Sequence, residues 1–276
     1  MRKLLRANFF RLFKDKVFLI SLALMFIGGA AIPVIHYIDN SNNNSGWTPD
    51  TGFLTCVFFV FVLISIFTAL FLGSEYSDGT MRNKLIVGHR RSSIYLANLI
   101  VCITAGIMMC LAYVIPYVCI CIPLLGAFEH SVKDIVIFTA VVLALTAALA
   151  AIFTLFAMLC HNKAYTAAGC ILIAFAMLFA GIRIVSALNE PEYFDAYSYT
   201  ENGVTVEEDK ERNPNYLSGT KRQVYEFMYD FTSGGQALQL ANMKPDNPAL
   251  FVLYDGIIIV IATGCGMVLF KRKDLK

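Results

Sequence analysis

The chain has 276 residues, of which 58% are hydrophobic and only 15% are charged, and its formal net charge is +2. Its mean hydropathy of +0.64 excludes an ordinary soluble domain. The small net charge gives no reason to expect a nucleic-acid partner. A lipid bilayer is therefore the expected surrounding.

Six long stretches of the chain are almost free of charged residues. A transmembrane helix needs about 20 mostly apolar residues to cross about 30 Å of hydrocarbon. The stretches that meet this requirement are 17–38, 52–73, 94–128, 135–160, 164–188 and 250–270. The third is longer than a span needs, so we expect it to bend or to overrun the membrane. The sequence predicts an all-α membrane protein with six transmembrane helices.

The basic residues lie mainly on one side of these spans. The segments on the side of the N-terminus are 1–16, 74–93, 161–163 and 271–276. They hold 15 Lys and Arg against 4 Asp and Glu, whereas the segments on the other side hold 6 against 15. Since basic loops stay in the cytoplasm, we predict a multi-pass protein of the plasma (cytoplasmic) membrane with both termini cytoplasmic.

Residues 1–16 predict an amphipathic helix that lies in the headgroup plane of the membrane. Leu5, Phe9, Leu12 and Phe13 fall on one face at helical spacing, and Lys and Arg residues crowd the rest. Such a helix buries its apolar face and extends its charges toward anionic lipid. The alternative is a plain basic tail that only stops translocation.

Segment 74–93 joins the second and third spans on the cytoplasmic side. Gly79 and Gly88 punctuate it, and between them Met81, Leu85 and Ile86 can form an exposed apolar edge on a short helix. An exposed apolar edge on a cytoplasmic helix suits docking to a partner protein. The alternative is an ordinary solvated loop.

Two stretches of sequence indicate a family. The first runs Glu75-Tyr-x-x-Gly79-Thr80, then Lys84-Leu-Ile and the pair Arg90-Arg91 before Ile94-Tyr-Leu-Ala-Asn. The second is the ending Gly266-Met-Val-Leu-Phe-Lys-Arg-Lys-Asp-Leu-Lys. With the basic helix, six spans and a long loop before the last span, the whole chain resembles the membrane subunit (permease) of type-2 ATP-binding-cassette (ABC) transporters, in the bacterial six-span short form.

This resemblance implies an exporter subunit that is not itself an enzyme. The first cytoplasmic loop would be a coupling helix seated in a groove of a separate ABC ATPase, present in two copies, beside a second permease that is identical or homologous. No Gly-x-x-x-x-Gly-Lys-Ser/Thr loop, the usual phosphate-binding motif, occurs in this chain. ATP and Mg would therefore bind the ATPase subunit. This chain is expected to hold no cofactor and no metal. The residues assigned to coupling are Glu75, Tyr76, Gly79, Thr80, Met81, Leu85 and Ile86. Bacterial members often export antimicrobial peptides or drugs, so the expected substrate is such a peptide, a drug or another amphiphile.

The loop 189–249 is expected outside the cell and is acidic, with 11 Asp and Glu against 5 Lys and Arg. An acidic cluster at 207–211 indicates a solvated surface, or a field that attracts a cationic substrate. An apolar face formed by Val224, Phe227, Met228 and Phe231 predicts a helix. Gly234-Gly235 is expected to break it before a second short helix at 236–243, and the resemblance implies that such helices dip back into the outer leaflet.

Two charged residues lie inside predicted spans near their outer ends, Arg183 and Asp255. Ionisable groups in lipid are costly and are usually functional or paired. One interpretation is that Arg183 and Asp255 form an ion pair or line the outer exit of a transport route. The alternative is that Arg183 extends to the lipid headgroups and Asp255 faces water. The other candidates for the substrate pathway are Phe58, Phe59 and Phe61, whose alternative role is helix packing or contact with lipid.

The chain is thus divided into an interfacial helix (1–16), five spans with the coupling segment (17–188), an outer loop (189–249), and the last span with a basic tail (250–276). Two other functions are open. One is a membrane sensor or immunity protein that binds a ligand through the outer loop without transport. The other is a secondary transporter, which the sequence supports less because it has no visible inverted repeat and few charges in its spans.

Overall fold

A computed structural model of the chain describes residues 1–160, 162–194, 198–201, 204–207, 211–245 and 247–273. Of the acidic cluster expected at 207–211, residues 208–210 lie outside the described residues, as do 274–276 of the C-terminal motif. The elements in order are α1 (Arg2–Leu12), α2 (Lys16–Asn43), α3 (Asp50–Phe53), α4 (Cys56–Ser77), α5 (Thr80–Ile86), α6 (Arg91–Leu125), α7 (Val132–Leu159), α8 (Lys163–Leu188), β1 (Ser198–Glu201), β2 (Val204–Glu207), α9 (Gly219–Phe231), α10 (Ser233–Ala241) and α11 (Pro248–Arg272).

Six helical segments are long and apolar enough to cross a membrane: α2, α3 with α4, α6, α7, α8 and α11. Each coincides with a stretch predicted from the sequence, so the six-helix prediction is confirmed. The shortest, α11, has 25 residues, which is about 38 Å at the helical rise. The longest, α6, has 35 residues and continues through Pro116 and Pro123. It reaches about 52 Å, which is longer than the roughly 30 Å of hydrocarbon that a span has to cross.

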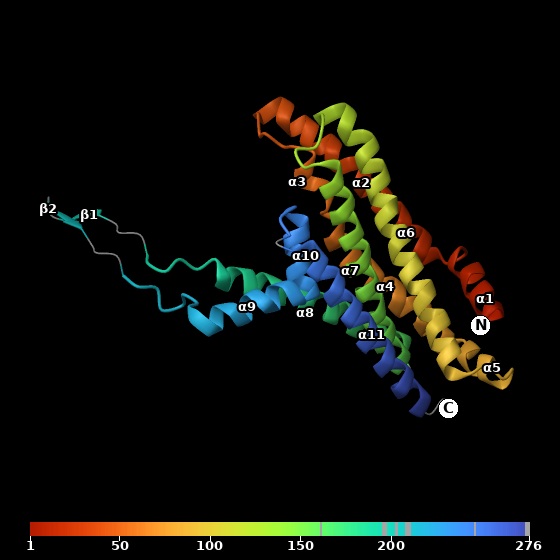
Figure 1. Cartoon of the computed structure of the whole chain (residues 1–276). Coiled ribbons are helices and arrows are strands. Elements are labelled where there is room, and N and C mark those ends of the chain that lie inside the picture. The colour runs from red at the N-terminus through yellow and green to blue at the C-terminus, as the bar shows by residue number, and fades with distance from the viewer. Residues whose placement is uncertain (161, 195–197, 202–203, 208–210, 246, 274–276) are drawn as a thin grey trace.

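The second span lies at the centre of the bundle (Figure 1). Its helix α4 contacts α2, α6, α7, α8 and α10, while α2 packs along α6 and α11 along α7. Phe61, Phe67 and Phe71 of α4 are at most 1% exposed and fill the interior. In the most apolar 18-residue window of each span, 67% of the residues are buried in the second span but only 17% in α8 and 17% in α11. The last two helices thus present most of their apolar surface outward.

The N-terminal helix α1 forms as predicted, and one side of it packs on the bundle. Leu4, Asn8 and Leu12 are buried against the bundle, and α1 packs on α6. Phe13, on the apolar face that is predicted to meet lipid, is 54% exposed. The side of α1 that packs on the bundle is organised around polar Asn8, and the lipid contact of the apolar face stays a prediction.

The segment before the last span contains an arm and an inserted helix. The end of α8 and helix α9 lie side by side and lead away from the bundle toward the β1–β2 hairpin (Figure 1). In that antiparallel hairpin Tyr199 pairs with Val206. The sequence predicted short helices in the second half of this loop and did not predict the hairpin. Helix α10 instead turns back into the bundle, where it contacts α8, α4 and α7 and is buried along most of its length.

The two predicted helix-breaking glycines have another role. The break between α9 and α10 falls at Thr232, whose side chain accepts a hydrogen bond from the backbone of Gly235. A Cβ atom on Gly234 would lie 1.9 Å from the carbonyl oxygen of Met177 in α8. A Cβ on Gly181 would likewise lie 2.5 Å from the backbone of Gly234. Glycine therefore permits backbone-to-backbone packing of α10 on α8, as small residues do between membrane helices.

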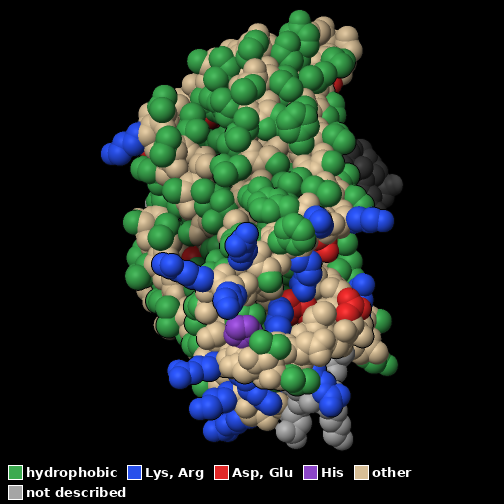
Figure 2. Space-filling model, turned by 90° about the vertical axis from the view of Figure 1, so that its right-hand side faces the viewer, with side chains coloured by type: hydrophobic (Ala, Val, Ile, Leu, Met, Phe, Trp, Pro, Cys, Tyr) green, Lys and Arg blue, Asp and Glu red, His purple; other side chains and the backbone are tan. Residues whose placement is uncertain are grey.

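The charged side chains are unevenly distributed along the molecule. Lys and Arg gather toward one end of the face shown in Figure 2, and hydrophobic side chains cover the rest of it. This end, called the basic end below, contains α1, α5, the first turn of α6 and the end of α11 (Figure 1). Charged groups outside an apolar band are the arrangement expected of a protein that spans a bilayer.

Candidate functional site

The predicted coupling segment forms a short helix at the basic end. Helix α5 begins after Gly79, whose φ of 67° makes the turn from α4, and the chain leaves it at Gly88 with a φ of 90°. Both values lie in the left-handed region that favours glycine. The hydroxyl of Thr80 donates to the carbonyl oxygen of Glu75 at 3.1 Å and fixes α5 to the end of α4. The prediction of a short helix between the two glycines is confirmed.

The predicted apolar edge of α5 is only partly exposed. Met81 is 2% exposed and belongs to the core, and Leu85 is half-buried against it. By contrast, Ile86 is 73% exposed and its neighbour Val87 is 75% exposed. The expectation that Met81 and Leu85 would be free was wrong, because α5 folds onto the bundle with that side. The surface available to a partner is the tip formed by Ile86 and Val87.

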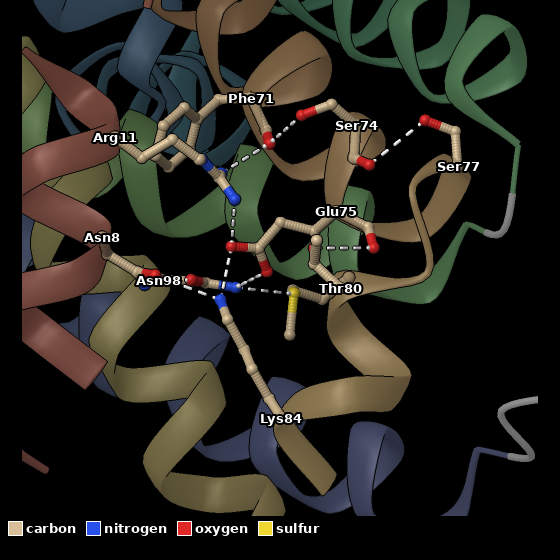
Figure 3. Close-up of polar contacts among 10 residues, drawn as sticks. Asn8, Arg11, Phe71, Ser74, Glu75, Ser77, Thr80, Lys84 and Asn98 are labelled. Atoms are coloured by element: carbon tan, nitrogen blue, oxygen red, sulfur yellow. Dashed lines mark hydrogen bonds and ion pairs between the residues drawn. The ribbon is translucent and has the colours of Figure 1, made fainter. Parts of the chain in front are cut away.

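A buried carboxylate connects this helix to the rest of the protein. The side chain of Glu75 has no exposed surface, and its Oε1 atom accepts from Arg11 of α1 and from Lys84 of α5, each at 2.5 Å. The amide of Asn98 in α6 donates to Oε2 at 3.0 Å. Figure 3 shows these three side chains converging on Glu75 from different helices. Glu75 thus links three helices inside the protein and is not a docking residue. It and its contacting side chains are called the Glu75 cluster below.

Further hydrogen bonds extend the Glu75 cluster. Asn8 donates to the side-chain oxygen of Asn98 at 2.6 Å, and Lys84 donates to the side-chain oxygen of Asn8 at 3.1 Å. Arg11 also donates to the carbonyl oxygen of Phe71 at 2.8 Å, with its guanidinium 3.6 Å from the centre of the Phe71 ring. The polar side chains of this cluster therefore bond to one another across α1, α4, α5 and α6, although the Nε atom of Arg11 has no hydrogen-bond partner among the described residues.

The electrostatics of the cluster are unbalanced, because one carboxylate faces two cations. Burial lowers the pKa of Lys84, and the charge and hydrogen bond of Glu75 oppose that shift. Breaking a buried ion pair costs more than the pair itself contributes, since the remaining charge is left without a partner. Together these contacts couple any movement of α5 to α1 and to the core of the bundle.

A separate set of contacts holds the C-terminal end of α11 at the same level. Lys273 donates to the carbonyl oxygens of Met158 at 2.8 Å and Cys160 at 3.0 Å, and its ammonium lies 4.1 Å from the centre of the Tyr76 ring. The hydroxyl of Tyr76 donates to the same carbonyl of Met158 at 2.6 Å. Burial lowers the pKa of Lys273 to about 8, although the carbonyls and the ring favour its ammonium form. Tyr76, assigned to coupling, thus packs against the ends of α7 and α11.

The sequence singled out Glu75 and the short helix α5, but not most of the side chains that contact Glu75. A usable signal was present for two of them. Asn8 occupies the same helical face as Leu4 and Leu12, at spacings of four residues, and Asn98 is a polar residue inside an apolar stretch. A polar residue on an otherwise apolar face predicts a buried hydrogen-bonded partner. For Arg11 and Lys84 the sequence carries no such signal, because both lie among many other basic residues.

The two charged residues inside spans are not paired with each other. Asp255 is fully buried in α11, and neither carboxylate oxygen has a hydrogen-bond partner among the described residues. Arg183 is exposed and lines a cavity of about 610 Å³ between α8 and α9, together with Tyr225 and Met228. The hypothesis of an ion pair and the alternative that Asp255 faces water are both wrong. An Arg183 side chain that extends toward headgroups agrees with its exposure.

Replacing Asp255 with Leu is expected to raise the free energy of unfolding by about 1–3 kcal/mol, because it removes two buried oxygens without partners. Asp255→Asn keeps polar atoms in the same place and is expected to change stability much less. Both can be measured by thermal melting of the purified chain in detergent. A loss of stability in the Leu variant would mean that Asp255 has a partner.

The three phenylalanines proposed for the pathway do not share one surface. Phe61 is fully buried, Phe58 is half-buried against the core, and Phe59 is 47% exposed. They therefore face in different directions from α4, and Phe59 is the most open of the three to lipid or to a neighbouring subunit. Among the described residues, no group of three or more His, Cys, Asp or Glu side chains is placed to hold a metal ion.

Comparison with protein-family models gave no match, and comparison with curated proteins gave none either. The site is therefore interpreted from its own residues and geometry.

Proposed function

We propose that this chain is the membrane-spanning permease subunit of an ATP-driven ABC exporter that moves an amphiphilic substrate out of the cell or the membrane. Antimicrobial peptides and drugs are substrates of this kind. In the proposal ATP hydrolysis occurs on a separate cytoplasmic ATPase, present in two copies, which also holds ATP and Mg. The basic end and both termini lie in the cytoplasm, as the distribution of Lys and Arg favours, and the α8–α9 arm lies outside.

The observation that carries this proposal is the construction of α5. The ion pair of Lys84 with the buried Glu75 holds the helix to the bundle, while its end exposes two adjacent apolar residues, Ile86 and Val87. A solvated loop has no need of either feature. A helix that is fixed to the bundle and offers an apolar tip suits the transfer of movement from a partner to the spans.

A second permease subunit would complete the transport route. The outward faces of α8 and α11 carry large exposed apolar side chains, among them Leu172, Phe179, Val260 and Ile261. Lipid or another subunit must cover these faces, and the densely packed centre of one copy around Phe61 supports a route between two copies. The pair can be identical or homologous.

The substitution Val87→Asp is expected to lower association with the ATPase at least about tenfold. A buried valine contributes about 1.5–3 kcal/mol, and burying an unpaired carboxylate adds a penalty. The measurement is co-purification of the ATPase with the tagged full chain in mild detergent, quantified against the amount of chain recovered.

The matched control is Val132→Asp, the same change at a residue that is 78% exposed at the start of α7, away from the basic end. It should leave co-purification unchanged. Equal loss in both variants would point to general damage and not to a docking tip. If no ATPase accompanies the folded native chain, the permease proposal fails, and the sensor becomes the leading candidate.

The sensor or immunity protein keeps one observation in its favour. The cavity between α8 and α9 has an exposed cation, Arg183, beside the apolar side chains of Ile184 and Met228. A cavity of this mixed character on the arm is suited to an amphiphilic ligand that arrives from outside. Ligand binding without any ATPase partner would favour this function over transport.

A further inference from the structure

A second cavity at the basic end lies between the first turn of α6 and the last turns of α11. Its volume is about 650 Å³, and it is lined by Arg90, Arg91, Ser92, Met267, Val268 and Lys271. Three of the six lining residues are cations, one carries a hydroxyl and two are apolar. Among the described residues, no acidic side chain lines it. The coupling contacts at Glu75 and the tip of α5 are not part of this cavity.

One of the three cations, Arg91, holds the walls of the cavity together and is not available to a ligand. Arg91 donates to the carbonyl oxygens of Phe270 at 3.0 Å and Lys271 at 3.3 Å, and also to that of Lys273. The guanidinium therefore satisfies the C-terminal carbonyls of α11 and holds α11 against α6. Because of this contact the two helix ends form fixed walls.

The other two cations have no partner in the part of the chain that the structure describes. Arg90 and Lys271 are exposed, and no ion pair or hydrogen bond of either side chain is present among the described residues. Arg90 precedes α6, whose first turn has no side-chain cap. The free amides of that turn add partial positive charge to the same cavity. The cavity thus attracts an anion.

The apolar part of the lining indicates what kind of anion fits. Met267 is half-buried and Val268 is 53% exposed, one turn or less before Lys271 on α11. Apolar side chains directly beside cations, at the end of a membrane-spanning helix, match the boundary between acyl chains and headgroups. Basic cavities between transmembrane helices bind anionic lipid headgroups in this way.

We propose that the α6–α11 cavity binds one anionic phospholipid, whose phosphodiester is held by Arg90, Lys271 and the hydroxyl of Ser92, and whose acyl chain lies along Met267 and Val268. The proposal goes beyond transport and does not depend on it, because a sensor with the same structure would bind the lipid equally. Such a lipid would tie the start of the third span to the end of the sixth.

The test is titration of the purified full chain in detergent with phosphatidylglycerol or phosphatidylcholine, with the bound lipid counted by native mass spectrometry. In parallel, thermal melting is followed in about 0.5 M salt, where the screening length is about 4 Å and loose surface attraction is weak. We expect one phosphatidylglycerol per chain and a higher melting temperature, with no effect of phosphatidylcholine.

The variant Arg90→Gln with Lys271→Gln should weaken phosphatidylglycerol binding roughly 30-fold, and Lys271→Gln alone about fivefold. The matched control is Arg6→Gln with Arg82→Gln, which removes two exposed charges from the same end without touching the cavity. It should keep the native affinity. The single variant changes one exposed side chain and preserves the Arg91 contacts, so it tests the proposal even if the double variant does not fold.

Three results would overturn this assignment. Equal weakening in the control pair would show a general attraction of the basic end to anionic lipid. Equal binding of phosphatidylcholine would exclude recognition of net negative charge. Protection by inorganic phosphate as strong as that by phosphatidylglycerol would identify a site for a free anion, in which Met267 and Val268 have no role.

Discussion

Replacing Glu75 with Gln is expected to lower the free energy of unfolding by about 3–5 kcal/mol, the cost of removing one partner from a buried ion pair. The carboxylate is completely buried, and it is the acidic partner of both Arg11 and Lys84. Its loss leaves Arg11 and Lys84 close together without an acidic partner. Their side chains are 31% and 15% exposed, so water partly solvates the two charges and we expect a value at the lower end of this range. Thermal melting in detergent, or unfolding by a denaturing detergent, measures the effect.

The control for this variant is Asp78→Asn, the same chemical change three residues further along. Asp78 is exposed, and within the described part of the chain its side chain accepts only a 3.3 Å hydrogen bond from the neighbouring Ser77. Its replacement should change stability by less than about 0.5 kcal/mol. Equal stability of the Gln variant and the native chain would show that the contacts of Glu75 do not hold α1 and α5 to the bundle.

A double variant separates the ionic contribution from simple loss of packing. Adding Lys84→Met to Glu75→Gln removes one of the two cations that would otherwise remain unpaired and keeps the aliphatic stem. Because the two residues are in contact, we expect the double variant to be more stable than the sum of the single effects predicts, by about 0.5–3 kcal/mol. Additive effects would mean that the charges of Glu75 and Lys84 act independently.

Replacing Gly234 with Ala is expected to destabilise the chain by about 3 kcal/mol, at the upper end of the usual cost of overpacking. The added Cβ would lie 1.9 Å from the carbonyl oxygen of Met177. The obstructing atom belongs to the backbone of α8, so no side chain can rotate away and α10 itself must move. We expect a lower melting temperature and faster proteolysis in the α9–α10 segment.

Gly256→Ala in α11 is the matched control, because no atom lies within 4 Å of the position that its Cβ would take. Alanine is favoured over glycine in a helix by about 1 kcal/mol, so this variant should be as stable as the native chain or more so. If Gly234→Ala were equally harmless, α10 would not be packed against α8 as closely as its glycines indicate.

The six long helices could be predicted from the sequence because their signal is local. A run of about 20 apolar residues must satisfy its backbone hydrogen bonds internally in lipid, and only a helix does so within one segment. The turn at Gly79 could be predicted for the same reason, since a positive φ is a property of one residue. The helical face of α9 was also visible in the spacing of Phe227 and Phe231.

The site was only partly predictable because its contacts join distant parts of the chain. Arg11 and Glu75 are 64 residues apart, and Asn8 and Asn98 are 90 apart. The apolar surroundings of Asn8 and Asn98 indicate that each is buried beside a polar partner, but they do not show which residue that partner is, and Arg11 resembles the other basic residues around it. Met81 illustrates the same limit, because it looked like an exposed docking residue until α5 was seen to fold onto the bundle.

The sequence by itself determined that this is a chain of six membrane-spanning helices with a strongly basic end, because hydropathy and charge are sums over neighbouring residues. Only the tertiary structure decided which polar groups meet. It placed Glu75 between two cations inside the protein, left Ile86 and Val87 as the exposed tip, and inserted α10 against Gly181. These features depend on how helices pack, and packing is set by contacts between residues far apart in the chain.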